Sequence, residues 1–258
     1  MKRSGDCENA VAHYLSQCRS LWEQLQLEPT DQQRFDLAEA LTGFIYPKYR
    51  FSEFDRNFLD DQEFAKFYET HVSKFNYHSY DRKYLLKEIL KLVESVPGDT
   101  IEAGVYEGAG SYLIARHARG AGKRHHLFDS FEGLSEPGAL DGDYWRQGMM
   151  AIPEEQVRSH LSEFDNVCYW RGWIPERFYE VADQNFSFLH VDVDIYQPTL
   201  DTIAFFYPRM NERAIILFDD YGFASCPGAR KAVDEFFADK PEPVIELPTG
   251  QALIIIKH

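Results

Sequence analysis

Two short apolar segments of this chain each end in a pair of acidic residues. They occupy residues 188–194 and 215–220. A short apolar run that stops at carboxylates is typical of a buried strand in a parallel sheet, and ligands of such sheets bind beyond the carboxyl ends of the strands. Neighbouring strands would bring Asp192 together with Asp219 and Asp220. The pattern therefore predicts a cleft with several acids on its wall.

Carboxylates gathered at one sheet edge need a compensating positive charge. Two unit charges ~4 Å apart repel by about 4 kcal/mol at an effective dielectric constant near 20, so the acids must share a proton or a cation. Mg²⁺ takes oxygen ligands and usually keeps positions for water or substrate. The acids therefore favour an enzyme with a divalent ion.

Composition limits the alternatives. The 258 residues suffice for one large α/β domain with or without a helical extension. The net charge of −15 argues against nucleic-acid and membrane-surface partners. The four cysteines lack C-x-x-C spacing, which argues against a zinc or dithiol site. The amino terminus does not resemble a signal peptide and no apolar stretch approaches about 18 residues, so we expect a cytoplasmic protein.

The periodicity of apolar residues changes along the chain. Residues 1–95 have helical spacing and are expected to form a helical extension or lid. Residues 96–258 alternate between strand and helix patterns, which is typical of a Rossmann-like, mostly parallel sheet. Two runs joined by a glycine-containing turn, 244–247 and 252–256, predict an antiparallel hairpin at the end. The other expected strands are 100–103, 125–129, 167–170 and the two acid-tipped runs; the expected helices are 111–119, 153–164, 175–182, 199–210 and 229–239.

A glycine-rich turn follows the first of these strands. Gly104, Gly108 and Gly110 have the spacing G-x-x-x-G-x-G, which differs from the G-x-G-x-x-G of dinucleotide dehydrogenases. Glycines let a backbone approach a ligand closely, and the start of the following helix favours negative charge. Asp129 ends the second strand, where an acid can accept both hydroxyls of a ribose. The alternative role for Asp129 is to cap the turn that follows it.

Four motifs in this order carry a resemblance to a known family. They are residues 102–108, 127–134, 190–196 and 218–221. The chain resembles class I S-adenosylmethionine-dependent methyltransferases, and specifically the TylF-type macrocin O-methyltransferases, over about residues 80–258. That family methylates sugars of macrolides and related natural products. The resemblance implies methyl transfer from S-adenosylmethionine to a hydroxyl of a small molecule, a sugar or another secondary metabolite, with no nucleic acid or membrane involved. It leaves a homo-oligomer open.

The resemblance also assigns residues to the expected site. It implies that Asp192, Asp219 and Asp220 bind Mg²⁺, that Glu102, Gly104 and Gly108 hold the methionine end of the cofactor, and that Asp129 holds its ribose. The sequence departs from the family at Glu107, where a basic residue is common, and at 211–213, where a Gly-Gly turn is common. The full predicted cofactor set is Glu102, Gly104, Val105, Tyr106, Gly108, Ser111, Asp129, Ser130, Gly172, Trp173 and Asp192.

The identity of the general base stays open at this point. By resemblance the ion lowers the pKa of the acceptor hydroxyl, and Asp194 or Asp192 takes the proton. Asp194 is equally suited to orienting a metal ligand. Catechol-type relatives have a lysine where this chain has Ile195. His190 lies inside an apolar strand, which favours a core histidine over a base.

Three other functions share parts of this pattern. A phosphatase or phosphotransferase of the haloacid-dehalogenase type also uses D-x-D with Mg²⁺, but on the first strand of its sheet. A nicotinamide dehydrogenase shares the glycine turn and the ribose acid but has no use for the acid cluster. A non-catalytic protein that only binds the cofactor would have no use for the three acids of the predicted metal site, and this argues against it.

Overall fold

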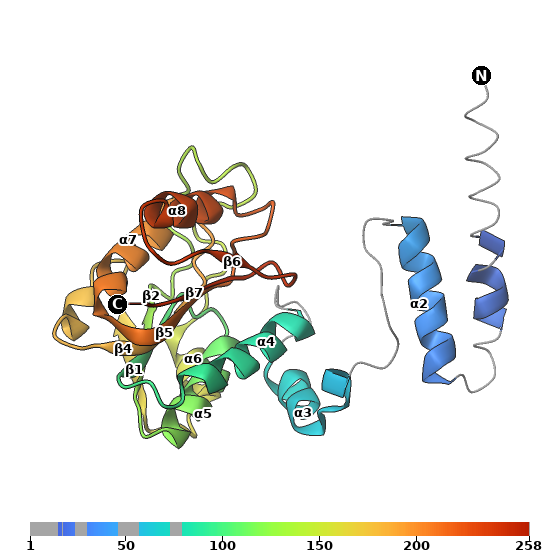
Figure 1. Cartoon of the computed structure of the whole chain (residues 1–258), viewed down its shortest axis with the longest axis horizontal. Coiled ribbons are helices and arrows are strands. Elements are labelled where there is room, and N and C mark those ends of the chain that lie inside the picture. The colour runs from blue at the N-terminus through green and yellow to red at the C-terminus, as the bar shows by residue number, and fades with distance from the viewer. Residues whose placement is uncertain (1–14, 17, 24–29, 46–56, 73–78, 258) are drawn as a thin grey trace. The chain divides into compact units, whose positions relative to one another are not determined.

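The structure, a computed structural model, describes residues 15–16, 18–23, 30–45, 57–72 and 79–257 (Figure 1). The chain divides into two compact units, Met1–Ala65 and Lys66–His258. The first unit contains α2 (Asp31–Ile45) and η1 (Asn57–Asp60), and α3 (Gln62–His71) crosses the boundary. Much of the predicted 1–95 extension lies outside the described residues. Helix α4 (Tyr80–Leu90), which that prediction assigned to the extension, belongs to the second unit.

The second unit is built on a seven-stranded sheet of order β3-β2-β1-β4-β5-β7-β6. Strands β1 to β5 are parallel, β7 is antiparallel to β5, and β6 is antiparallel to β7. This confirms the predicted mostly parallel sheet with a carboxyl-terminal antiparallel hairpin. The strands are β1 (Asp99–Ala103), β2 (His125–Asp129), β3 (Val167–Arg171), β4 (Phe186–Val191), β5 (Met210–Phe218), β6 (Ile245–Glu246) and β7 (Ala252–Ile255).

Helices cover both faces of the sheet. Figure 1 shows α7 and α8 on one side and α4, α5 and α6 on the other. Because both faces are covered, the central strands are apolar throughout, and all six residues of β4 are buried. The helices are α4, α5 (Ala109–Gly120), α6 (Glu154–His160), α7 (Tyr196–Phe206) and α8 (Pro227–Phe237), with 3₁₀ turns η2 (Lys91–Val93), η3 (Phe178–Val181) and η4 (Tyr207–Arg209).

Several predicted element boundaries were wrong. Strand β5 begins at Met210, so the predicted helix over 199–210 ends early, at Phe206. The prediction missed the first residues of β5 because they are polar: residues 212 and 213 are exposed, while 214–218 are buried. The helix predicted over 153–164 is only Glu154–His160, and that over 175–182 is the 3₁₀ turn η3. Among the described residues, no helix combines the length and apolarity needed to cross a membrane.

The order of the strands positions the site. The chain crosses from β1 to β2 in one direction and from β4 to β5 in the other, so the loops after these strands diverge at the β1–β4 junction. Gly104, directly after β1, has φ +83°, and a Cβ there would lie 1.8 Å from the carbonyl oxygen of Asp192. Only glycine allows this close approach. The glycine turn and the acid-tipped end of β4 are thus held against each other.

Candidate active site

A cleft of about 590 Å³, open to solvent, lies at the carboxyl ends of β1, β2 and β4. Its wall includes many of the residues predicted to bind the cofactor: Gly104, Val105, Tyr106, Asp129, Ser130, Trp173 and Asp192. Glu102, Gly108, Ser111 and Gly172 do not line it. Tyr106 (φ 48°) and Asp194 (φ 60°) both line the cleft in the left-handed region, which non-glycine residues rarely adopt and which is enriched at functional sites.

Asp129 fixes the turn beside which the cofactor is expected. Its Oδ2 accepts the N–H of Val105 at 2.7 Å, and its Oδ1 accepts the N–H of Phe131 at 2.6 Å. Burial raises the pKa of Asp129 despite these hydrogen bonds. The structure therefore contains the capping contact considered as an alternative. The backbone N–H of Tyr106 also donates to Asp129. Because each carboxylate oxygen has two lone pairs, these three hydrogen bonds still leave acceptor capacity for the ribose.

Glu102 lies behind the cleft wall and is almost fully buried, with 1% exposure. It accepts a hydrogen bond from the hydroxyl of Ser111, and its Oε1 lies 2.9 Å from His190 Nδ1. Burial opposes its charge, but His125 and His190 lower the pKa of Glu102 to about 2. Glu102 therefore connects β1, β4 and α5, and its predicted contact with the cofactor stays a prediction.

His190 links Glu102 to the acid cluster. Its Nε2 lies 3.5 Å from Asp219 Oδ1, which is an ion-pair distance and not a hydrogen bond. Burial favours the neutral ring, but the carboxylates of Asp219 and Glu102 raise the pKa of His190 to about 10. A fully buried imidazolium between two carboxylates fits the core role and not that of a base.

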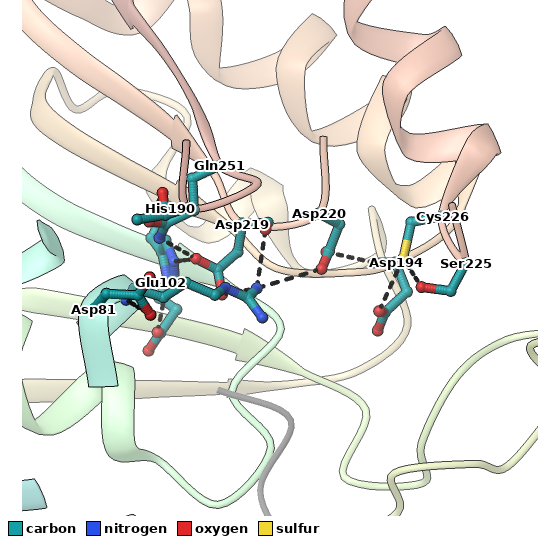
Figure 2. Close-up of polar contacts among 11 residues, drawn as sticks. Asp81, Glu102, His190, Asp194, Asp219, Asp220, Ser225, Cys226 and Gln251 are labelled. Atoms are coloured by element: carbon teal, nitrogen blue, oxygen red, sulfur yellow. Dashed lines mark hydrogen bonds and ion pairs between the residues drawn. The ribbon is translucent and has the colours of Figure 1, made fainter. Parts of the chain in front are cut away.

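Four acids meet after β4 and β5. The two strands pair in register, with His190 opposite Leu217 and Val191 opposite Phe218. The backbone N–H of Asp194 donates to Asp220 Oδ2 at 3.0 Å. Figure 2 shows the polar side chains in a row from Glu102 and His190, through the acids, to Cys226. The acids in that part of the site are Asp192, Asp194, Asp219 and Asp220.

The electrostatics of these acids call for positive charge. Burial, and then the charge of Asp192, raises the pKa of Asp194 to about 8. Burial and the neighbouring carboxylates also raise the pKa of Asp192 and of Asp220 well above the ordinary value. Protons or a cation must offset this repulsion.

Arg82 on α4 is a site residue that sequence reasoning missed. Its Nη2 donates to Asp219 Oδ2 at 2.5 Å and to the Asp219 carbonyl oxygen at 2.9 Å, and it lies 3.8 Å from Asp220 Oδ1. Its side chain is 7% exposed, with Cζ 4.6 Å from the centroid of the Phe223 ring. Arg82 precedes Asp219 by 137 residues, and no local pattern marks it.

The predicted metal ligands fall into two groups. His190, Asp192 and Asp219 form one group, and Asp194, Asp220 and Cys226 form the other, each with its ligand atoms within 4.8 Å of one another. Asp219 also accepts a hydrogen bond from the Gln251 side chain. Oxygen donors with excess negative charge fit a hard divalent ion. The particular set Asp192, Asp219 and Asp220 stays a prediction.

A second hollow of about 480 Å³ adjoins the cleft, and the two share Met150, Asp192 and Asp194. Trp145 is buried in its wall and donates its indole N–H to Cys226 Sγ at 3.3 Å. The Cys226 thiol in turn donates to Asp194 Oδ1 at 3.6 Å. The remaining wall residues are Arg82, Tyr144, Asp220, Phe223 and Ser225. Acids and aromatic rings thus surround a space next to the cleft.

Comparisons with known proteins agree with this geometry. Residues 81–247, well over half of the chain, match the sequence model of the macrocin-O-methyltransferase (TylF) family. The chain is 30% identical over 159 residues to the 8-demethyl-8-(2,3-dimethoxy-alpha-L-rhamnosyl)-tetracenomycin-C 4'-O-methyltransferase of Streptomyces olivaceus, a match over 56% of this chain and 60% of that protein. It is also 30% identical over 158 residues to the demethyldecarbamoylnovobiocin O-methyltransferase of Streptomyces niveus, with the same coverage.

Solved structures give the same result for the fold. The O-methyltransferase NovP matches with a TM-score of 0.60 and 25% identity over 71% of this chain and 84% of NovP. The calicheamicin methyltransferase CalS11 matches in fold, with a TM-score of 0.60 and 19% identity over 78% of this chain and 93% of CalS11. The chain spans about 60% of the length of the curated relatives that it matches. On its sequence match, the chain belongs to the macrocin-O-methyltransferase (TylF) family.

Proposed function

We propose that this chain transfers the methyl group of S-adenosylmethionine to a hydroxyl of a small molecule, specifically a sugar of a glycosylated natural product. One observation carries the proposal: the cleft at β1, β2 and β4 and the acid-lined hollow meet at Asp192 and Asp194. The names of the relatives, one of which is an O-methyltransferase of a rhamnosyl-bearing tetracenomycin, support the reaction and the acceptor class.

In this proposal the cleft holds the cofactor. Asp129 accepts a ribose hydroxyl with the acceptor capacity that the backbone N–H groups of Val105, Tyr106 and Phe131 leave. Gly104 admits the methionine portion close to the backbone. Trp173 and Ile174 supply apolar wall, as adenine requires. The sulfonium methyl group would then face the shared wall at Asp192 and Asp194.

The hollow holds the acceptor, and Asp194 takes its proton. With a pKa raised to about 8, Asp194 is a stronger base than an ordinary carboxylate and titrates near neutral pH, as a general base should. General base catalysis contributes about 3–5 kcal/mol, whereas holding the reacting atoms at near-attack distance contributes ~7–11 kcal/mol. Tyr144 and Trp145 on one wall and Phe223 on another provide surfaces for the sugar. Positioning by these walls should therefore contribute more than the base.

The acid cluster fits a magnesium ion in addition. Asp192, Asp219 and Asp220, the ligands that the family resemblance implies, would hold it, and Asp192 and Asp220 line the hollow. When bound, such an ion supplies a Lewis acid that lowers the pKa of a hydroxyl. The charge balance of the site supports this assignment.

Transfer of an isotopically labelled methyl group tests the proposal. The chain would be incubated with methyl-labelled S-adenosylmethionine, Mg²⁺ and a panel of deoxysugar glycosides, and products analysed by mass spectrometry. We expect label on a sugar hydroxyl. Binding of S-adenosylhomocysteine without any transfer would favour a non-catalytic binding protein, and hydrolysis of a phosphate ester would favour the phosphotransferase alternative.

A further inference from the structure

Lys83 on α4 is a buried lysine that the proposed reaction does not use. It is only 2% exposed. Helix α4 packs against α5, and Figure 1 shows the two helices side by side. Lysine is almost never buried to this extent without an ionic partner, because burying an unpaired charge is costly. Among the residues that the structure describes, none forms a hydrogen bond or an ion pair with the Lys83 ammonium. The ammonium group therefore calls for an anion.

The ammonium lies at the start of α5. A Cβ at Gly110, the second residue of α5, would lie 3.3 Å from Lys83 Nζ and 2.6 Å from Glu102 Oε1. Helix α5 begins after Gly108, which supplies no capping side chain, and its first turn contains no acid. The first N–H groups of a helix lack partners within the helix and favour an anion. A buried ammonium and an uncapped helix start thus meet at one point.

The acids nearest to this point have other cations as partners. His190 lies between two of them, with Nδ1 2.9 Å from Glu102 Oε1 and Nε2 3.5 Å from Asp219 Oδ1. Arg82 donates to the outer oxygen of Asp219, Oδ2, at 2.5 Å. Glu102 and Asp219 are therefore served by His190 and Arg82. Lys83 is the cation of this group that has no acid bonded to it.

Lys83 also lies close to the cleft. Burial and the neighbouring carboxylates raise the pKa of Asp192, and the charge of Lys83 opposes that rise. Asp192 lines the cleft together with Gly104, which follows Glu102 by two residues. An anion at the start of α5 can therefore be part of a ligand that occupies the cleft. The methionine portion of S-adenosylmethionine ends in a carboxylate, which is an anion of this kind.

We propose that Lys83 and the first N–H groups of α5 together bind the α-carboxylate of S-adenosylmethionine, and that Lys83 makes the cleft selective for a cofactor with an intact methionine portion. This rests on the cofactor assigned under the proposed function. It gives a role to a residue outside the four sequence motifs, on a helix that precedes the sheet.

Isothermal titration at one fixed pH tests this without any methyl transfer. S-adenosylhomocysteine has the carboxylate, whereas 5′-methylthioadenosine keeps the nucleoside and the sulfur but lacks the amino acid portion. We expect Lys83→Met to weaken binding of S-adenosylhomocysteine by roughly 10- to 150-fold, and that of 5′-methylthioadenosine by less than about twofold. Lys87→Met is the matched control: Lys87 lies one turn later on α4, 3.9 Å from Glu88, and its loss should leave both affinities unchanged.

A uniform result overturns the proposal. If Lys83→Met leaves the affinity for S-adenosylhomocysteine unchanged, or weakens both ligands equally, Lys83 only balances the charge of nearby acids. Should Lys83→Met fail to fold by circular dichroism, the native chain decides. It should bind S-adenosylhomocysteine at least about tenfold more tightly than the α-carboxamide of that ligand, which is neutral at this position. Equal binding of these two ligands would contradict a carboxylate site.

The same titrations separate this proposal from the proposed function. A native chain that binds neither S-adenosylhomocysteine nor 5′-methylthioadenosine would contradict the cofactor assignment and the carboxylate site together. Absence of methyl transfer by a chain that binds S-adenosylhomocysteine would count against the proposed reaction alone, and the affinities of Lys83→Met would still decide the carboxylate site.

Discussion

The site has two halves, a cofactor half at the ends of β1 and β2 and an acid half at the ends of β4 and β5. The carboxylates of the two halves obtain their hydrogen bonds and charge partners in different ways. At the ends of β1 and β2, Asp129 is held by the backbone N–H of Phe131, two residues away, and by that of Val105 in the turn after β1. At the ends of β4 and β5, the acids depend on side chains from other elements, including Arg82 on α4 and Cys226 at the start of α8. The cofactor half is therefore complete as folded, whereas the acid half depends on protons, an arginine or an ion for its charge balance.

Asp194→Asn should give the largest difference between the two halves, because it should lower turnover without changing cofactor affinity. Loss of the general base is expected to lower kcat by roughly 100-fold or more, while the Kd for S-adenosylhomocysteine stays within twofold. Steady-state kinetics and isothermal titration measure the two quantities. A parallel loss of cofactor affinity would show that the halves are not independent.

Asp129→Ala tests the cofactor half in the same way. Removing a charged acceptor of ribose hydroxyls costs about 1.5–3 kcal/mol, so cofactor affinity should fall by roughly 10- to 150-fold. Turnover at saturating cofactor should change little. Asp183→Ala removes an exposed acid that does not line the cleft and serves as the control. Unchanged titration of Asp129→Ala with S-adenosylhomocysteine would argue against the ribose contact.

Removal of the ion should affect only the acid half. Chelation with EDTA is expected to lower methyl transfer by about tenfold or more, because the Lewis acid is lost. Titration with S-adenosylhomocysteine should give the same Kd with and without EDTA. Full activity in EDTA would contradict a role for the ion. Protons and Arg82 would then be enough to balance the negative charge of the acids.

Cys226→Ala should have a smaller effect on the same half. The thiol bridges Trp145 and Asp194, and burial raises its pKa, so it stays a hydrogen-bond donor. Losing one such bond costs about 1 kcal/mol, which corresponds to roughly fivefold in kcat. Cys226→Ser should restore much of the loss with little change in KM for the cofactor. Cys168→Ala is the matched control, and an equal effect there would point to general destabilisation.

The pH dependence of the free energy of unfolding should reveal the raised pKa of Asp194. In the folded chain its pKa is about 8, against about 3.9 for an unfolded aspartate. Between those values the native state holds a proton that the unfolded state has released, so this group's contribution falls as pH rises, by at most ~1.4 kcal/mol per pH unit, and levels off above pH 8.

The comparison with Asp194→Asn isolates this contribution from histidines that titrate in the same range. From pH 5 to pH 8, without divalent ions, the Tm of the native chain should decline relative to that of Asp194→Asn by about 2–4 °C for each kcal/mol. Added Mg²⁺ should reduce the decline. Parallel Tm curves for the two proteins would rule out a raised pKa at Asp194.

The difference between the halves also explains what the sequence could reveal. The strands of the sheet, the glycine turn, Asp129 and the neighbouring acids all follow from local patterns, because apolar runs and their ends identify parallel strands. Arg82 and Gln251 are separated from Asp219 by 137 and 32 residues, and neither lies in a recognisable motif. Glu102 matched a motif, but its contact with His190 joins residues 88 apart, which no local pattern marks.

A structure of the chain with S-adenosylhomocysteine tests the central claim most directly, namely that the two halves form one site. We predict the ribose hydroxyls on Asp129 and the sulfur directed at the wall formed by Asp192 and Asp194. Density for the ligand outside this cleft, or with its sulfur turned away from those two acids, would contradict the account.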